Sequence, residues 1–164
     1  MCKNILVIMV MFAIVIGCEK ELEVISILPI SESDMPEEVA AFFEEHLPGV
    51  SEYGNGSGCF FLDDEKNKSL MINSIDELKA AMYSPFELPD IDFGKYTLVI
   101  GQHLVGGTAY RVREHNIVIK PEGIELNISV EKPDGTYWVI CPVYYWGLYP
   151  KLAQEFINVN LIVK

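Results

Sequence analysis

Alternating apolar and polar residues recur through the second half of the chain and restrict it to a sheet-rich fold. Residues 124–131 alternate with a period of two, which places every second side chain on one face of a strand. Similar patterns predict further strands over 96–100, 108–120, 136–143 and 156–163. Short turns such as Lys132-Pro133-Asp134-Gly135 separate them, and consecutive strands joined in this way favour an antiparallel meander.

The first half of the chain predicts two short helices. Pro36 followed by Glu37-Glu38 is typical of a first helical turn, and Ser74-Ile75-Asp76-Glu77 has the form of a capping box. The side chains expected to face the core are Val39, Phe42, Phe43 and Leu47 in the first helix and Ile75, Leu78 and Met82 in the second. Between the helices, a strand over 59–62 is expected to pair with one over 69–72. Two helices plus a sheet predict an α+β domain.

The N-terminus has the pattern of an export signal. Lys3 precedes an unbroken apolar run over 5–16, which is short for a permanent membrane span. The run ends in Val15-Ile16-Gly17-Cys18, which resembles the lipobox of bacterial lipoproteins, with Val where Leu is most common. The resemblance implies lipid attachment at Cys18 and removal of residues 1–17. An ordinary signal peptide or an uncleaved anchor with an incidental cysteine is the alternative.

These boundaries predict an acidic tether over 18–34 and one domain over 35–164. The tether sequence Glu19-Lys20-Glu21-Leu22-Glu23 is similar to those of surface-exposed lipoproteins in Bacteroidetes-like bacteria. The resemblance implies anchoring in the cell envelope, in the outer membrane, on either its periplasmic or its surface face. The formal net charge is −12 and the acidic residues concentrate in the first half, which argues against nucleic acid as a partner.

Two cysteines remain once Cys2 and Cys18 are assigned to the leader and the lipid. Cys59 and Cys141 both lie in apolar, strand-like sequence, so they either form a disulfide or pack as two free thiols. No cysteine or histidine spacing predicts a metal site or a cofactor. His46, His103 and His115 are expected at the surface or at strand ends, and no pattern of a nucleophile or of paired acids predicts an enzyme.

Residues 69–164 contain three short motifs, Asp92-Phe93-Gly94-Lys95, Gly106-Gly107-Thr108-Ala109-Tyr110 and Pro142-Val143-Tyr144-Tyr145. With these motifs the segment resembles the PrcB-type C-terminal domains found in small bacterial lipoproteins. The chain departs from the family in having Ala109 directly before the aromatic residue and extra aromatic residues after Pro142. The family was named from a lipoprotein that accompanies a surface protease complex, and it implies no catalytic residue.

An aromatic cluster near the C-terminus is the candidate binding surface. Tyr144, Tyr145, Trp146 and Tyr149 are placed on a loop over 142–150, where rigid rings with polar tips suit a protein or glycan partner. The alternative is that these rings cover the open end of the sheet. The sequence therefore predicts a non-enzymatic, membrane-anchored binding module. A stabiliser or inhibitor of a surface protease and a glycan-active enzyme remain the other hypotheses.

Overall fold

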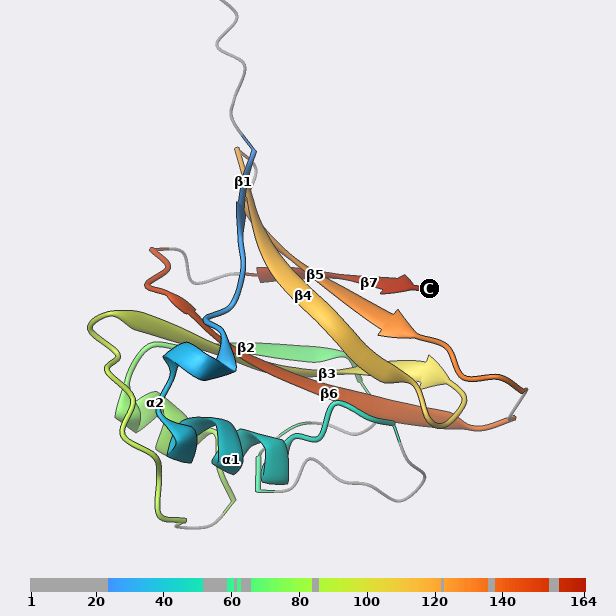
Figure 1. Cartoon of the computed structure of the whole chain (residues 1–164), viewed down its shortest axis with the longest axis horizontal. Coiled ribbons are helices and arrows are strands. Elements are labelled where there is room, and N and C mark those ends of the chain that lie inside the picture. Colours follow the sequence, from blue (N-terminus) through green and yellow to red (C-terminus); the bar gives the residue numbers. More distant parts are fainter. Residues whose placement is uncertain are drawn as a thin grey trace, which may run out of the picture.

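The protein folds into a layer of helices and two stacked β-sheets. The computed structural model describes residues 24–51, 59–60, 62, 66–83, 86–121, 123–135, 138–153 and 157–164. In Figure 1 the helices lie below one sheet, and the second sheet rises above it at an angle. The elements are β1 (Ile25–Ile27), a 3₁₀ turn η1 (Glu32–Asp34), α1 (Glu37–His46), β2 (Lys68–Ile72), α2 (Ile75–Ala80), β3 (Tyr96–Gly106), β4 (Arg111–Lys120), β5 (Gly123–Glu131), β6 (Ile140–Pro150) and β7 (Ile157–Val163).

The strands are divided between the two sheets. The middle sheet has the order β2-β3-β6 and the outer sheet has the order β1-β4-β5-β7. All neighbouring pairs are antiparallel except β5 and β7, which are parallel. The prediction of an α+β fold with both helices in the first half is confirmed. Only β4 and β5 pair as consecutive strands of the predicted meander, because the chain changes sheet before and after them.

The middle sheet is buried on both faces, which separates the core into two clusters. Leu98 and Ile100 of β3 face the helices and form the helix-side cluster with residues of α1 and α2. Val99 and Val105 of the same strand face the outer sheet and form the inter-sheet cluster. This alternation follows from the period of two along a strand. A strand with both faces buried has consecutive apolar residues, as β3 does over residues 98–100.

The two helices close the lower face of the middle sheet. In α1 the buried residues Val39 and Phe43, followed by Leu47, recur at helical spacing and pack as predicted. In α2 the Ser74 hydroxyl accepts a hydrogen bond from the Glu77 amide at 3.2 Å, which confirms the predicted cap. No helix within the described ranges has the length and apolar character needed to cross a membrane.

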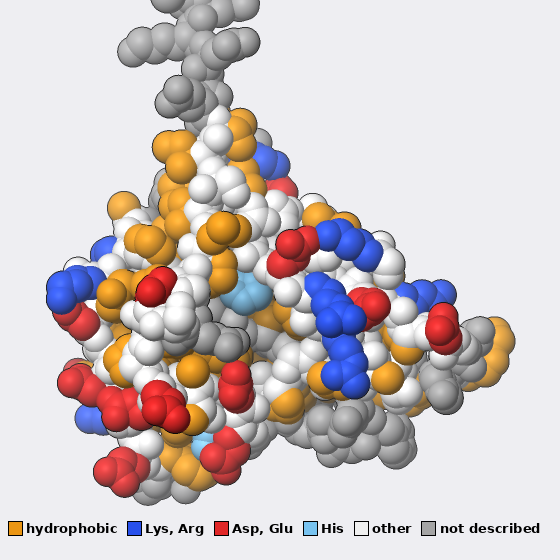
Figure 2. All heavy atoms as spheres, viewed as in Figure 1, with side chains coloured by type: hydrophobic (Ala, Val, Ile, Leu, Met, Phe, Trp, Pro, Cys, Tyr) orange, Lys and Arg blue, Asp and Glu red, His pale blue; other side chains and the backbone are white. Residues whose placement is uncertain are grey.

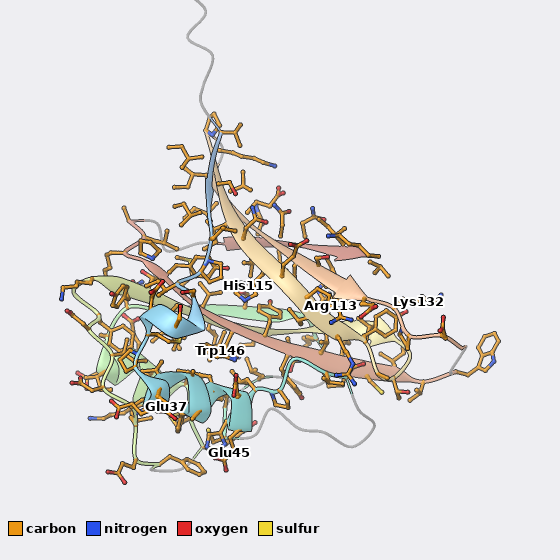
Figure 3. All side chains as sticks on the ribbon, viewed as in Figure 1. Glu37, Glu45, Arg113, His115, Lys132 and Trp146 are labelled. Atoms are coloured by element: carbon orange, nitrogen blue, oxygen red, sulfur yellow. The ribbon has the colours of Figure 1, made fainter. Side chains whose placement is uncertain are left out.

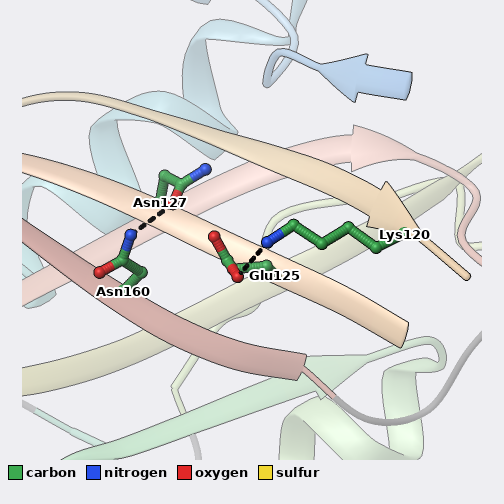
Figure 4. Close-up of polar contacts among 4 residues, drawn as sticks. All are labelled: Lys120, Glu125, Asn127 and Asn160. Atoms are coloured by element: carbon green, nitrogen blue, oxygen red, sulfur yellow. Dashed lines mark hydrogen bonds and ion pairs between the residues drawn. The ribbon is translucent and has the colours of Figure 1, made fainter. Parts of the chain in front are cut away.

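The far face of the outer sheet is polar. Figure 4 shows two of its cross-strand contacts, a hydrogen bond of 3.0 Å from the Asn160 amide to Asn127 and an ion pair of 2.7 Å between Lys120 and Glu125. Their partners come from adjacent strands, which is the usual unit of sheet stabilisation. Most apolar side chains of the outer sheet, such as Leu126 and Ile128, lie on the face turned towards β3 and β6, whereas Ile162 lies opposite Ser129 and is 41% exposed.

Several local predictions differ from the structure. The segment expected as a tether contains β1, which pairs with Ile117 to Ile119 of β4 and so belongs to the outer sheet. The predicted hairpin over 59–72 is wrong, because β2 pairs with β3 and Phe60 bridges to Met82. Ile75 was expected to face the core, but it is 40% exposed at the start of α2.

Candidate functional site

A pocket of about 540 Å³ opens where α1, the chain around η1 and the two sheets meet. Figure 2 shows this face hollowed near a histidine side chain, with acidic side chains over the helices and basic side chains on the opposite side. In Figure 3 His115 and Trp146 lie at its centre, between β4 and α1. The lining residues are Leu28, Pro29, Ile30, Ser31, Met35, Glu44, Leu47, Gly49, Val112, Arg113, Glu114, His115, Tyr145, Trp146, Gly147 and Leu148.

One wall of the pocket is the segment 28–31 that leads from β1 into η1. Its Ile30 amide donates a hydrogen bond of 2.7 Å to the Leu148 carbonyl on the open edge of β6. Pro29 cannot donate a backbone hydrogen bond, so the pairing of β1 with β4 stops after Ile27. The chain therefore leaves the outer sheet at this point and crosses to the middle sheet, which places it over the space between them.

An irregularity in β4 directs His115 into the pocket. The register of β4 against β5 shifts between Val112 and Glu114. Before the shift, Tyr110 and Val112 pack in the inter-sheet cluster, and after it the inward side chains are Ile117 and Ile119. A β-bulge of one residue reverses which positions face inward. His115 therefore shares the inner face with Ile117, where unbroken alternation would have turned it outward.

The imidazole of His115 joins the two sheets. Its Nδ1 lies 2.5 Å from the Tyr149 hydroxyl on β6, and the ring also makes a hydrogen bond with the backbone of Trp146. Burial lowers the pKa of His115 to about 4, and the bond to the Trp146 backbone opposes that shift. Burial also raises the pKa of Tyr149 far above its ordinary value. Both groups are therefore neutral at pH 7.

Gly147 makes room for this histidine. A Cβ at position 147 would lie 2.4 Å from the His115 Cε1 atom and 3.1 Å from the Tyr149 ring. Real Cβ atoms do not approach other atoms so closely, so a larger residue would displace the imidazole. Gly147 therefore helps to form the pocket, because it lets β4 and β6 come close enough for His115 and Tyr149 to form a hydrogen bond.

The predicted aromatic binding surface is wrong for its three tyrosines. Tyr144 and Tyr149 are 0% exposed and Tyr145 is 3% exposed, because β6 extends to Pro150 and both faces of the middle sheet are covered. The expected loop over 142–150 is thus a strand. Trp146 is the exception: its indole stacks on Phe43 with ring centroids 5.1 Å apart and also lines the pocket.

The charged groups in the lining are largely paired within the described residues. Arg113 forms an ion pair with Glu131, and the Glu114 carboxylate lies 2.5 Å from the Lys164 ammonium group. The Lys164 ammonium lowers the pKa of Glu114. Glu44 of α1 is exposed and has no hydrogen bond or ion pair with another described residue. Among the described side chains of the lining, the charge without an ion-pair partner is the negative charge of Glu44.

The three histidines do not come together as one site. His46 packs its ring against Phe42 and Phe86 at the end of α1. His103 lies on β3, where its Nε2 is 3.3 Å from the Asn67 amide. The expectation of surface or strand-end positions does not hold for His115, which lies part-buried in the middle of β4. Within the described part of the chain, no three His, Cys, Asp or Glu side chains are grouped as metal ligands would be.

The remaining predicted site residues are cysteines. Cys59 and Cys141 are both buried free thiols, which corresponds to the second of the two alternatives. Cys59 packs in the helix-side cluster, whereas Cys141 lies on β6 opposite Val105. Burial raises the pKa of each thiol. Cys18, the predicted lipid attachment residue, lies outside the described residues.

The pocket itself was missed from the sequence, although one signal for it exists. Tyr110 and Val112 occupy even positions of the long strand and Ile117 and Ile119 occupy odd ones, although Val118 between them is apolar as well. Such a change of parity predicts a bulge between them. Nothing local to the sequence indicates that Glu44, the 28–31 segment and β6 meet at the same place.

Comparison with known proteins does not place the chain in a family. No family model matches it, and neither the curated proteins nor the solved structures contain a match.

Proposed function

We propose that this protein is a lipid-anchored cell-envelope module that binds a ligand or partner in the pocket between β4, β6 and α1. The observation that carries the proposal is the pocket itself. Its volume of about 540 Å³ falls within the usual range of ligand sites, which is roughly 300–1,000 Å³. Its walls combine aliphatic side chains with Trp146 and a few polar groups, as binding sites commonly do.

The protonation and hydrogen bonding of the polar groups in the pocket favour binding over catalysis. His115 is neutral at pH 7 and already bonded to Tyr149 and to the backbone of Trp146, so it has little freedom to exchange protons with a ligand. A glycoside hydrolase requires one carboxyl group with a raised pKa. Glu114 has the opposite shift, because it is paired with Lys164. A non-enzymatic module is the function that these contacts support best.

The lipobox resemblance at Cys18 supports the anchoring part of the proposal. Six residues separate Cys18 from Ile25, where β1 begins, so a lipid on that cysteine would hold the domain close to the membrane. A chain of this kind would be retained by acyl groups, and several acyl chains give stable attachment where one is marginal. Replacement Cys18→Ser is expected to leave an unprocessed or soluble protein.

Site-specific photo-crosslinking in intact cells tests both parts together. A photoreactive amino acid replaces Leu28, which is 70% exposed and lines the pocket, or Tyr83, which is 58% exposed and lies outside the lining. We expect an envelope adduct from position 28, none from position 83, and loss of the adduct when Cys18→Ser is added. Equal adducts from both positions, or none from either, would contradict binding in this pocket. An unchanged adduct and unchanged membrane partition in Cys18→Ser would contradict the anchor.

A further inference from the structure

We propose that the pocket selects an organic cation, an ammonium or guanidinium group on an apolar stem, held between the Glu44 carboxylate and the Trp146 indole. This inference rests on the proposed function and specifies the chemistry of its ligand. Two sources could supply such a group: a lysine or arginine side chain of an envelope polypeptide, or a free amine.

The charge of the lining is the first argument. Among the described residues, the charged members of the lining are Glu44, Arg113 and Glu114, two acids and one base. The base and one acid are already engaged by Glu131 and Lys164. His115 contributes no positive charge, because burial keeps it neutral. Of these three charged residues, only Glu44 has no hydrogen bond or ion pair with another described residue, and a cation would supply one.

The charges around the pocket are also negative on the α1 side. Helix α1 carries Glu37, Glu38, Glu44 and Glu45, and its only basic residue type is His46 at the last position. Figure 2 shows acidic side chains gathered over the helices below the hollow, and Figure 3 places Glu37 and Glu45 on α1. Basic side chains lie on the opposite side of the hollow, so the α1 side is where the charges favour a cation.

The indole of Trp146 supplies the second contact that an organic cation needs. One face of its ring is covered by Phe43, with an interplanar angle of 26°, while the side chain still lines the pocket. Tryptophan is the aromatic side chain that binds cations best, with about 0.5–1 kcal/mol at exposed sites. The stacking of Phe43 on Trp146 places α1, the helix that also carries Glu44, beside β6.

The apolar part of the ligand is matched by the other walls. Leu28, Ile30, Met35 and Leu148 line the pocket around the polar groups. A hydrated metal ion or a bare ammonium ion would gain nothing from these surfaces, whereas an alkyl stem would bury against them. The described lining therefore combines an apolar surface for the stem of the ligand with the Glu44 carboxylate for its cationic group.

The fluorescence of Trp146 provides a direct assay with full-length protein in detergent. The chain has two tryptophans, and Trp138 is 98% exposed, so Trp138→Phe leaves Trp146 as the only reporter. The probes are three tripeptide amides, acetyl-Leu-Lys-Leu, acetyl-Leu-norleucine-Leu and acetyl-Leu-Glu-Leu, together with free phenethylamine and agmatine. Titrations at low and high salt give the dissociation constants.

We expect the lysine peptide to bind more tightly than the norleucine peptide, and the glutamate peptide to bind most weakly. Glu44→Gln should raise the dissociation constant of the lysine peptide by about three-fold or more at low salt. It should leave the dissociation constant of the norleucine peptide unchanged. Glu45→Gln is the matched control, since it removes the same charge from the next position of α1, outside the lining. It should change the affinity by less than Glu44→Gln does.

The outcomes separate the two proposals. If the lysine and norleucine peptides bind equally, or if Glu44→Gln and Glu45→Gln have the same effect, the cation preference is wrong while a binding pocket survives. If no probe of any charge changes the Trp146 emission, the small-ligand pocket and the cation preference fail together, and the crosslinking experiment alone decides whether a larger partner binds here. Tighter binding of a free amine than of the lysine peptide assigns the cation to a small molecule, and the reverse assigns it to a polypeptide.

Discussion

The part-buried His115 makes the stability of this protein depend on pH in a defined direction. In the folded state the pKa of His115 is about 4, whereas an exposed histidine in the unfolded chain has a pKa of about 6.5. The unfolded state therefore takes up a proton first as the pH falls. The stability associated with neutral His115 is complete above about pH 6.5 and is lost progressively as the pH falls towards 4.

The size of the effect follows from the difference between the two pKa values. A shift of about 2.5 units corresponds to about 3 kcal/mol when the group is fully protonated in both states. About 2 kcal/mol of this should already be lost at pH 5. Small domains have an unfolding free energy of about 5–15 kcal/mol, so the loss is a substantial fraction of the total.

Urea unfolding at pH 7.5 and pH 5 measures the loss of unfolding free energy in the wild type and in His115→Gln, whose side chain does not titrate. Other groups, such as the carboxylates of Asp92 and Glu114, contribute to both proteins and cancel in the difference between them. We expect the wild type to lose about 2 kcal/mol more than the variant between the two pH values. His103→Gln is the control, since burial also lowers the pKa of His103 but the ring is less enclosed.

Equal pH dependence in the wild type and in His115→Gln would refute the argument that His115 is held neutral by burial. A measurement on the unaltered protein covers the case in which the variant does not fold. The imidazole resonances of His115, followed by NMR, should stay in their neutral positions down to about pH 5. Titration of that ring near pH 6.5 in the folded protein would refute the same argument.

Three further predictions concern packing and thiol chemistry. Gly147→Ala should cost about 1–3 kcal/mol in thermal or urea unfolding, because its Cβ would meet the imidazole at 2.4 Å, whereas Gly106→Ala on β3 has nothing within 4 Å and should cost less. Equal costs would contradict the steric argument. Phe43→Ala, at a fully buried position, should cost about 3–5 kcal/mol, and a loss below about 1 kcal/mol would show that α1 is not anchored through this ring. Cys59 and Cys141 should resist alkylation in the folded protein and each take one label after denaturation without reductant, as followed by mass spectrometry; a species that labels only after reduction would show that they pair.

The local patterns predicted much of the secondary structure correctly. Helix α1 follows from the spacing of Val39, Phe43 and Leu47, and the start of α2 follows from Ser74 and its hydrogen bond to Glu77. The alternation in β5 is equally plain. These features depend on neighbours within a few residues, which is why a sequence reports them directly.

The position of β6 was predicted less well because the residues that pack against it are distant in the sequence. Tyr144, Tyr145 and Tyr149 have the composition of an exposed interaction loop, yet every second residue faces the helices and the others face the outer sheet. Only the stacking of layers on both sides of β6 makes these rings part of the core. The same argument applies to His115, whose inward direction depends on the bulge in β4 and on the space left by Gly147.

The sequence by itself determined the α+β class, the helix boundaries near their caps and the presence of a lipobox-like N-terminus, since each is written in residues close together along the chain. The tertiary structure alone decided which strands share a sheet, which aromatic rings are buried and where a pocket forms. Glu44 is separated from Trp146 by about a hundred positions, and the segment 28–31 reaches β6 through one backbone hydrogen bond. Such contacts arise because burying both faces of the middle sheet lowers the free energy of the whole chain, and no short segment contains that information.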